Sequence, residues 1–170
     1  MDQKPSSLLV EYLPLLPSGK AIDIAMGKGR NALYLAERGF DVEGVDIDEA
    51  AVGICKEKAE KKGVKMKSVV ADLTSYQIFE ENYNVILCFH YLQRDLIPMM
   101  KAGLKKGGII LYETFLIDQH IQWGTPRHRE YCFMRNELLD FFKDFRILYY
   151  KEGFVTKEKA LASLVAQKNS

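Results

Sequence analysis

Apolar positions along this chain follow two alternating patterns. Short runs rich in β-branched and aromatic residues, typical of strands, alternate with segments in which apolar residues recur at helical spacing. This alternation predicts a parallel sheet wound by crossover helices. Strands are predicted over residues 20–25, 40–46, 64–71, 83–89, 107–115, 145–154 and 160–167.

The helical segments carry recognisable start and stop signals. Helices are predicted near residues 7–13, over about 30–38, after Asp48, between the fourth and fifth strands, and over 136–142. Asp48 fits a helix N-cap, and Gly39 fits the left-handed position that ends a helix. Because only the short turn 155–159 separates the last two strands, they should form an antiparallel hairpin on the sheet edge.

Residues 116–133 match neither pattern and contain the only tryptophan. A loop this long within a compact domain is usually functional or disordered. We interpret its part "WGTPRHRE", residues 123–130, as a lid over an active site, because Arg127, His128 and Arg129 suit the binding of an anion and the handling of its proton. The alternative is a solvated basic loop that pairs with Glu130.

Composition narrows the class of protein. The length of 170 residues, with 48% hydrophobic and 28% charged residues, fits one globular domain over the whole chain. A formal net charge of +1 gives no electrostatic reason to expect a nucleic-acid or membrane partner. Three widely spaced cysteines match neither a disulfide framework nor a zinc pattern, which favours a reducing cytoplasm and no metal site. The first residues lack the features of a signal peptide. The oligomeric state stays open.

The stretch "AIDIAMGKGRNALYLA" places a glycine-spaced turn between the first strand and its helix. Gly27 and Gly29, with Asp46 at the end of the second strand, satisfy the fingerprint of a dinucleotide site. Two cofactors could explain this turn. The carboxylate of Asp23 would oppose a pyrophosphate at the helix N-terminus but could lie near a ligand that carries an ammonium group.

Two further features favour the cationic ligand. Asp72, in "VVADLTSY", follows the third strand, where it can accept a hydrogen bond from an adenine amine while the Leu73 N–H donates to the ring. In addition, a single domain of this length leaves no room for the separate substrate domain that most nicotinamide dehydrogenases carry.

With these motifs the chain resembles the class I S-adenosylmethionine-dependent methyltransferases. The resemblance rests on "DIAMGKG", "VEGVDID" and "VVADL", and "GKGRNALYLAERGFDVEGVDID" is most similar to the small tellurite-resistance-type methyltransferases. It implies a doubly wound, Rossmann-like, mostly parallel seven-stranded sheet, S-adenosylmethionine as cofactor, and methyl transfer to a small molecule or small anion. The residues predicted to bind the cofactor are Asp23, Ala25, Met26, Gly27, Gly29, Arg30, Asp46, Ile47, Asp72, Leu73 and Cys88.

The chain departs from the family pattern at Ala25, which replaces the first glycine, and at Met26, which takes a place often held by a small residue. Alanine has poor access to positive φ, so we expect a turn conformation that alanine allows. These two residues indicate either a remodelled methionine pocket or a domain that binds nothing. Arg30 opens a helix, where a cation is disfavoured, and should therefore reach Asp23 or the carboxylate of the cofactor.

A sulfonium methyl group is already electrophilic, so the enzyme mainly has to align the acceptor, and a base is needed only for a protonated acceptor. The predicted catalytic residues are His90, Arg127 and His128. His90 lies in "CFHYLQ", which differs from the motif of amide and adenine N-methyltransferases and argues against those acceptors. A loop histidine bonded to nearby backbone is the alternative for His90. The competing functions are a nicotinamide-dinucleotide-binding oxidoreductase module and a non-catalytic cofactor-binding protein.

Overall fold

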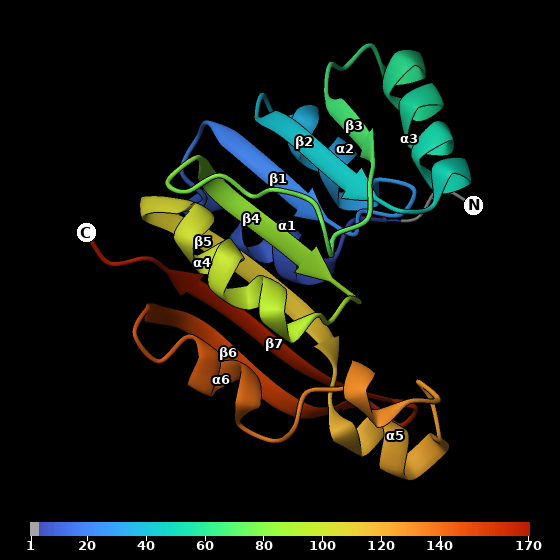
Figure 1. Ribbon diagram of the computed structural model, residues 1–170, viewed down its shortest axis with the longest axis vertical. Coiled ribbons are helices and arrows are strands. Elements are labelled where there is room, and N and C mark those ends of the chain that lie inside the picture. The colour runs from blue at the N-terminus through green and yellow to red at the C-terminus, as the bar shows by residue number, and fades with distance from the viewer. Residues whose placement is uncertain (1–3) are drawn as a thin grey trace.

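Seven strands form one mixed sheet in the computed structural model, which describes residues 4–170 (Figure 1). The strands are β1 (Lys20–Ile24), β2 (Asp41–Asp46), β3 (Lys67–Val70), β4 (Tyr83–Phe89), β5 (Leu104–Phe115), β6 (Arg146–Thr156) and β7 (Lys159–Gln167). Their spatial order is β3-β2-β1-β4-β5-β7-β6. The first five strands in this order are parallel, and β7 runs antiparallel to both β5 and β6. The predicted sheet and its C-terminal hairpin at the edge are confirmed.

Helices cover both faces of this sheet (Figure 1). They are α1 (Ser7–Tyr12), α2 (Arg30–Ala36), α3 (Glu49–Lys62), α4 (Ile97–Gly103), α5 (Ile117–Trp123) and α6 (Glu137–Phe141), with three 3₁₀ turns at η1 (Leu13–Leu15), η2 (Arg94–Leu96) and η3 (Arg129–Tyr131). Apolar side chains of α1, α2 and α3 pack on one face, and those of α4 and α6 pack on the other. Within residues 4–170 we find no helix with the length and apolar character needed to cross a membrane.

Local sequence signals explain how the elements begin and end. The Asp48 carboxylate accepts a hydrogen bond from the Ala51 N–H at 3.2 Å and caps α3, as predicted. Gly63 ends that helix with a φ of 66°, a left-handed conformation that glycine adopts readily. Most observed ends lie within two residues of the predicted ends, whereas β3 starts three residues later and β5 three residues earlier than the pattern indicated.

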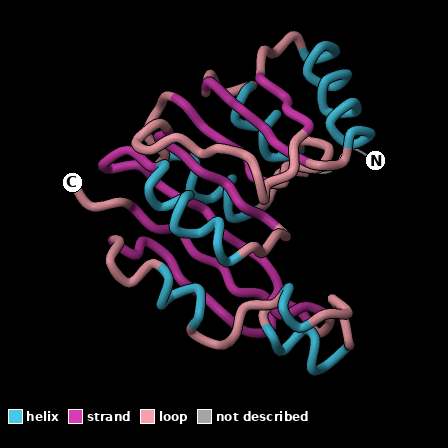
Figure 2. The backbone as a smooth tube through the Cα atoms, viewed as in Figure 1, coloured by secondary structure: helices cyan, strands magenta, loops and turns pink. Residues whose placement is uncertain are grey.

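One prediction about the secondary structure was wrong. Residues 116–133 are not an unbroken irregular loop, because Ile117–Trp123 form α5 and only the segment that follows it is irregular (Figure 2). The helix is held from outside: the side chain of Gln119 accepts a hydrogen bond from the Ala160 N–H at 2.7 Å and donates to the Glu158 carbonyl at 3.4 Å. Contacts with β7 therefore stabilise a helix that has little apolar periodicity of its own.

Candidate active site

The glycine-spaced turn lies at the carboxyl end of β1, where doubly wound sheets bind ligands. Ala25, Gly27 and Gly29 all have positive φ, with values of 56°, 57° and 78°. The expectation that Ala25 would avoid this region was wrong. The turn keeps a left-handed conformation at the alanine because the Met26 N–H donates to the Val45 carbonyl at 3.0 Å and ties the turn to β2. Alanine here carries the strain that the family's glycine would avoid.

Asp23 is buried beneath this turn, with 2% of its surface exposed. Burial raises the pKa of its carboxyl group to about 7, although a hydrogen bond from the Ala32 backbone and the positive charge of Arg30 both favour the ionised form. Its oxygen Oδ2 is buried and has no hydrogen-bond partner among the described residues. A buried oxygen without a hydrogen bond costs free energy, so Oδ2 is suited to accept a hydrogen bond from a donor group of a ligand.

Asp46 ends β2 and holds the loops on either side of it. Its Oδ2 accepts a hydrogen bond from the Gly27 N–H at 2.8 Å, and its Oδ1 accepts one from the Asp48 N–H at 2.9 Å. The carboxylate is half-buried and faces a cavity. Because each carboxylate oxygen can accept more than one hydrogen bond, the group can hold a vicinal diol while it anchors the turn.

A first cavity, of about 270 Å³, opens at the carboxyl ends of β1, β2 and β4. Its lining consists of five residues predicted to bind a cofactor and two from the loop after β4: Ala25, Asp46, Ile47, Asp72, Leu73, His90 and Tyr91. Ile47 is 67% exposed at the rim, whereas Leu73 is 6% exposed. These two side chains offer apolar surface for a flat heterocycle. We call this space the cofactor cavity.

Asp72 is preorganised within that lining. Its Oδ1 accepts hydrogen bonds from the Thr74 N–H at 2.9 Å and the Thr74 hydroxyl at 2.7 Å. These two hydrogen bonds lower the pKa of Asp72 below its usual value, so that it is ionised at neutral pH. An ionised carboxylate is a good acceptor for an exocyclic amine.

The other residues predicted to bind the cofactor do not line this cavity. Met26 is buried in the core against β2, and a Cβ at Gly44 would lie 2.0 Å from its sulfur. Gly29 packs against Cys55, whose sulfur would lie 2.3 Å from an added Cβ. Gly27 has open space where a side chain would begin, as a cradle for a ligand requires. The two glycines are therefore needed for different reasons. Gly29 allows close packing against Cys55, and Gly27 leaves open space for a ligand.

Arg30 and Cys88 also lie apart from the cofactor cavity. Arg30 makes no ion pair with Asp23 within residues 4–170, and its guanidinium donates instead to the Lys4 carbonyl at 3.3 Å. Cys88 is fully buried, and burial raises the pKa of its thiol to about 12. It is therefore a protonated core residue, and its side chain is not available to a ligand.

A second cavity, of about 480 Å³, adjoins the first and shares His90 and Tyr91 with it. Its lining combines the loop after β4, the end of β5 and the segment after α5: Thr74, His90, Tyr91, Leu92, Gln93, Thr114, Phe115, Pro126 and Tyr131. Of these nine residues, only His90 was a predicted catalytic residue, and Pro126 lies in the segment predicted to form a lid. We call this space the acceptor cavity.

His90 lies on the boundary of the two cavities and is held there by its backbone. Its φ is 56°, and its N–H donates to the Glu113 carbonyl at 2.8 Å. The ring packs against Phe115 with a centroid separation of 5.8 Å. Loss of water around the ring, together with the positive charges of Lys159 and Arg30, lowers the pKa of His90 to about 4. The imidazole is therefore neutral at physiological pH.

The rest of the loop after β4 is fixed by tyrosine contacts. The hydroxyl of the buried Tyr112 donates to the Tyr91 carbonyl at 2.9 Å. The Tyr91 hydroxyl in turn donates to the Gln93 side-chain oxygen at 2.6 Å. These hydrogen bonds orient the wall shared by the two cavities without any ligand.

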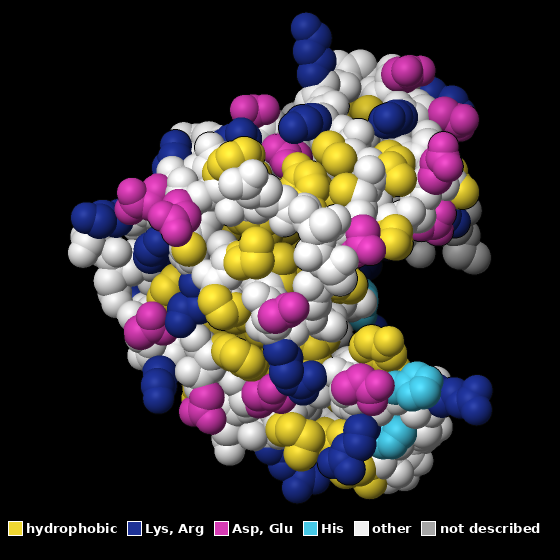
Figure 3. All heavy atoms as spheres, in the orientation of Figure 1, with side chains coloured by type: hydrophobic (Ala, Val, Ile, Leu, Met, Phe, Trp, Pro, Cys, Tyr) yellow, Lys and Arg dark blue, Asp and Glu magenta, His cyan; other side chains and the backbone are white. Residues whose placement is uncertain are grey.

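The segment after α5 reaches the acceptor cavity through Pro126 and Tyr131 only. The predicted catalytic residues Arg127 and His128 are exposed and do not line the cavity, and the His128 ring nitrogen lies 3.9 Å from the Glu130 carboxylate. In the space-filling view, the outline is notched between the parts that carry α3 and α5, and histidine side chains lie around that notch (Figure 3).

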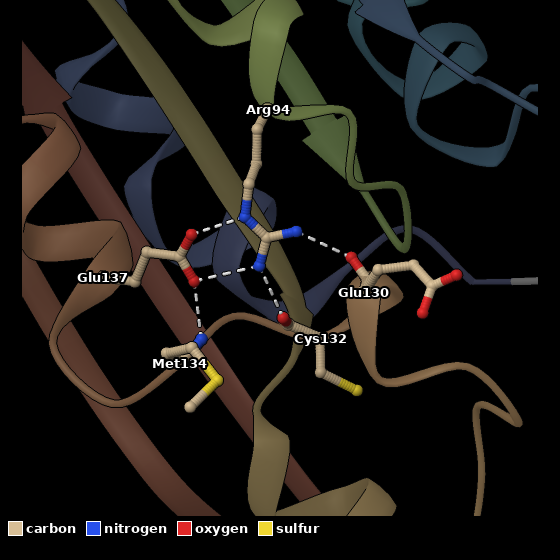
Figure 4. Close-up of polar contacts among 5 residues, drawn as sticks. All are labelled: Arg94, Glu130, Cys132, Met134 and Glu137. Atoms are coloured by element: carbon tan, nitrogen blue, oxygen red, sulfur yellow. Dashed lines mark hydrogen bonds and ion pairs between the residues drawn. The ribbon is translucent and has the colours of Figure 1, made fainter.

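Arg94 fixes this segment to the loop after β4, a contact that sequence reasoning missed (Figure 4). Its guanidinium donates to both carboxylate oxygens of Glu137, at 2.5 and 3.0 Å. It also donates to the carbonyls of Glu130, at 2.7 Å, and Cys132, at 2.9 Å. We call these contacts the Arg94 clamp. The clamp holds the backbone on both sides of Tyr131, which forms the outer wall of the acceptor cavity.

No cluster of three or more histidine, cysteine, aspartate or glutamate side chains suited to a metal ion occurs within the described part of the chain.

Comparison with known proteins identifies the family. Residues 5–162 match the family described as "Tellurite resistance protein TehB". The chain is 28% identical over 152 residues to a Haemophilus influenzae protein named "Probable S-adenosyl-L-methionine-dependent methyltransferase TehB", a match that covers 85% of this chain and 52% of that protein. The chain thus spans about half the length of the curated relatives it matches first.

Solved structures agree with this relationship. The crystal structure of TehB from Haemophilus influenzae has a TM-score of 0.83 and 26% sequence identity, and the match covers 96% of this chain and 62% of that one. An S-adenosylmethionine-dependent methyltransferase structure from Methanosarcina mazei has a TM-score of 0.74 at 19% identity, covering 98% and 99% of the two chains. At that identity the likeness shows the fold alone.

Proposed function

The chain belongs to the TehB family of S-adenosylmethionine-dependent methyltransferases, and from this premise we propose that it transfers a methyl group from S-adenosylmethionine to a small-molecule or small-anion acceptor. The observation that carries the proposal is the pair of adjoining cavities that share His90 and Tyr91. One cavity contains the acids expected for the cofactor, and the other leaves space for an acceptor beside it. A protein that only binds a cofactor has no need for the second space.

The residues of the cofactor cavity fit S-adenosylmethionine. Asp46 would accept hydrogen bonds from the ribose hydroxyls, and Asp72 would accept one from the adenine amine while the Leu73 N–H donates to the ring. The unpaired Oδ2 of Asp23 provides an acceptor beneath the turn for the ammonium group. When bound, S-adenosylmethionine supplies a methyl group on a positively charged sulfur.

Alignment would carry most of the catalysis in this site. The fixed wall formed by His90, Tyr91 and Gln93 would hold the acceptor at the boundary with the cofactor cavity. A neutral imidazole with a pKa of about 4 is a weak base, so His90 would orient an acceptor rather than remove a tightly held proton from it. Arg127 and His128 stay candidates for a closing lid, and closure would have to turn them inward.

The cytoplasmic location stays part of the proposal. All three cysteines, Cys55, Cys88 and Cys132, are free and buried, which suits a reducing compartment.

Calorimetric titration with S-adenosylhomocysteine, and separately with NADH, tests the cofactor. We expect S-adenosylhomocysteine to bind and NADH not to bind. Asp46→Ala should abolish or strongly weaken that binding. Asp41→Ala is the matched control, because Asp41 is an exposed acid at the opposite end of the same strand. Binding of NADH alone would favour the oxidoreductase module and refute the proposal. Equal losses in the two variants would remove the assigned site.

A further inference from the structure

Four of the nine residues that line the acceptor cavity carry aromatic rings. His90, Tyr91, Phe115 and Tyr131 come from three separate segments of the chain and line the same space. Aromatic walls favour an aromatic ligand, because rings pack well in offset or edge-to-face arrangements. The volume of about 480 Å³ also exceeds the need of a small oxyanion. One water takes about 30 Å³, so an anion of a few heavy atoms would leave most of this cavity to water.

The lack of charged side chains in the lining that the structure describes also argues against a small oxyanion. No lysine, arginine, aspartate or glutamate is among the described residues that line the cavity, and its polar side chains include Thr74, Gln93 and Thr114. A hard oxyanion that leaves water needs cations or several N–H donors to replace its hydration. The positive charges of Lys159 and Arg30 are felt at His90, at one end of the space, where they add to the effect of burial in lowering the pKa of His90. That end favours a single anionic atom.

The acceptor must also be reactive without a strong base. Because His90 holds a proton poorly, an alcohol or phenol would keep its proton at neutral pH and attack slowly. The thiolate is the nucleophilic form of a thiol, and an aryl thiol is more acidic than an alkyl thiol, so it is present as thiolate at neutral pH.

We infer that the acceptor cavity takes an aryl thiolate, with its ring between Phe115 and Tyr131 and its sulfur at the His90 end. The inference rests on the proposed methyl transfer and names its acceptor class. The thiolate sulfur supplies the electron pair of the new sulfur–carbon bond. The bond between the methyl group and the sulfonium breaks with its pair remaining on that sulfur, which becomes the neutral thioether of S-adenosylhomocysteine. The thiol proton is already in solvent.

The test uses the full chain and thiophenol as the probe. First, calorimetry measures S-adenosylhomocysteine binding. Second, saturation-transfer NMR measures thiophenol binding to the complex with S-adenosylhomocysteine, which requires no turnover. Third, release of S-adenosylhomocysteine from S-adenosylmethionine is compared for thiophenol, phenol, cyclohexanethiol and selenite. Phenol keeps the ring and changes the nucleophile, whereas cyclohexanethiol keeps the sulfur and removes the aromatic ring.

A matched pair of variants separates the cavity from the surface. Tyr131 is 53% exposed and lines the acceptor cavity, whereas Phe154 is 56% exposed and packs edge-on against Trp123 outside it. Tyr131→Ala should raise the KM for thiophenol by roughly tenfold, the scale of one aromatic contact, and leave the affinity for S-adenosylhomocysteine unchanged. Tyr131→Phe should restore the KM, and Phe154→Ala should not change it.

The outcomes are distinguishable. A kcat/KM for thiophenol at least about tenfold above those of the three other acceptors, with the expected variant pattern, supports the inference. If S-adenosylhomocysteine binds but thiophenol does not bind, the inference is overturned while the proposed cofactor site is upheld. If selenite is methylated as well as thiophenol, the inference is overturned and the proposed methyl transfer stands. If S-adenosylhomocysteine does not bind at all, the proposed function fails, and the acceptor assignment fails with it.

Discussion

Replacing Arg94 with alanine should loosen the outer wall of the acceptor cavity and leave the cofactor cavity intact. The variant removes both hydrogen bonds to Glu137 and the contacts with the Glu130 and Cys132 carbonyls. It also leaves the Glu137 carboxylate with the Met134 N–H, at 2.6 Å, as its remaining hydrogen-bond donor within the described chain. The segment that carries Tyr131 would then lose its fixed position.

The expected loss of unfolding free energy depends on how far the Arg94–Glu137 pair is exposed to solvent. The side chain of Arg94 is 36% exposed and that of Glu137 is 20% exposed, so solvent screens part of the attraction. An exposed ion pair contributes about 0.2 to 1 kcal/mol, whereas a hydrogen bond to a charged group contributes about 1.5 to 3 kcal/mol. We therefore expect Arg94→Ala to lower the free energy of unfolding by about 2 kcal/mol. A double-mutant cycle with Glu137→Ala should give a coupling of about 1 kcal/mol.

Acid should weaken the same contact. Burial raises the pKa of Glu137, but the hydrogen bonds from Arg94 and from the Met134 N–H, with the positive charge of Arg94, outweigh burial and hold the pKa below its usual value. A carboxyl group whose pKa is lowered by folding stabilises the protein above its unfolded pKa. That stability is lost as the pH falls through the folded pKa. The clamp should therefore be complete at neutral pH and open in acid.

Urea unfolding measures the stability, and acceptor kinetics measure the position of the wall. A loss of about 2 kcal/mol corresponds to a midpoint lower by about 1 M urea. The KM for the acceptor should rise several-fold while S-adenosylhomocysteine affinity stays unchanged. Arg135→Ala is the control, because Arg135 makes a similar two-bond pair with Asp118 but is 64% exposed. Its loss should stay below about 1 kcal/mol. Equal losses in the two variants, or a loss below about 0.5 kcal/mol for Arg94→Ala, would refute the reasoning.

The remaining predictions concern the turn, its acids and the lid. Asp46→Ala should weaken S-adenosylhomocysteine binding by about 2 to 3 kcal/mol, and Asp72→Ala should weaken it less, because water can replace one rim contact; an unchanged dissociation constant for Asp46→Ala in calorimetry would reject the assignment. Ala25→Gly should raise the free energy of unfolding by about 0.5 to 1 kcal/mol. It relieves about 1 to 2 kcal/mol of backbone strain at a φ of 56°, which exceeds the cost of the entropy that glycine adds to the unfolded chain. Lower stability of the variant in urea would contradict this. Folding raises the pKa of Asp23 from 3.8 to about 7. Its contribution to the free energy of unfolding is therefore full below pH 3.8 and is lost as the pH rises to about 7, by at most about 4 kcal/mol. Asp23→Asn should flatten the pH dependence of the unfolding free energy, and an identical slope between about pH 5 and 8 in the two proteins would show that Asp23 does not titrate there. Arg127→Ala and His128→Ala should lower turnover without changing S-adenosylhomocysteine affinity, and unchanged turnover in both would remove the lid.

Sequence pattern was sufficient for features that depend on neighbours along the chain. The cap of α3 at Asp48, the left-handed glycines and the C-terminal hairpin follow from local preferences that no distant contact overrides. Position of the acids was also predictable. Asp46 ends β2 and Asp72 follows β3, and parallel strands bring their carboxyl ends to one edge of the sheet.

Features that depend on distant partners were not predictable. In α5 the polar Gln119 is 7% exposed and the apolar Ile121 is 68% exposed, the reverse of the usual burial of apolar residues. The reason is that β7 holds α5 through the polar side chain of Gln119. Arg94 and Glu137 are separated by 43 positions, and nothing near either residue indicates the other. The position of the Met26 side chain was not predictable either, because it packs into the space that Gly44, in a neighbouring strand, leaves open.

The acceptor cavity is the clearest example of a feature that could not be predicted from the sequence. Its walls combine the loop after β4, the end of β5 and the segment after α5, so its shape exists only after the sheet has formed and the Arg94 clamp has closed. The motif at the carboxyl edge is a property of consecutive residues and can be recognised in the sequence. Burial around His90, which sets its pKa, and the ring of aromatic side chains come from residues far apart in the chain. Tertiary packing alone decided them, because solvent exclusion depends on everything that surrounds a side chain and not on its neighbours in sequence.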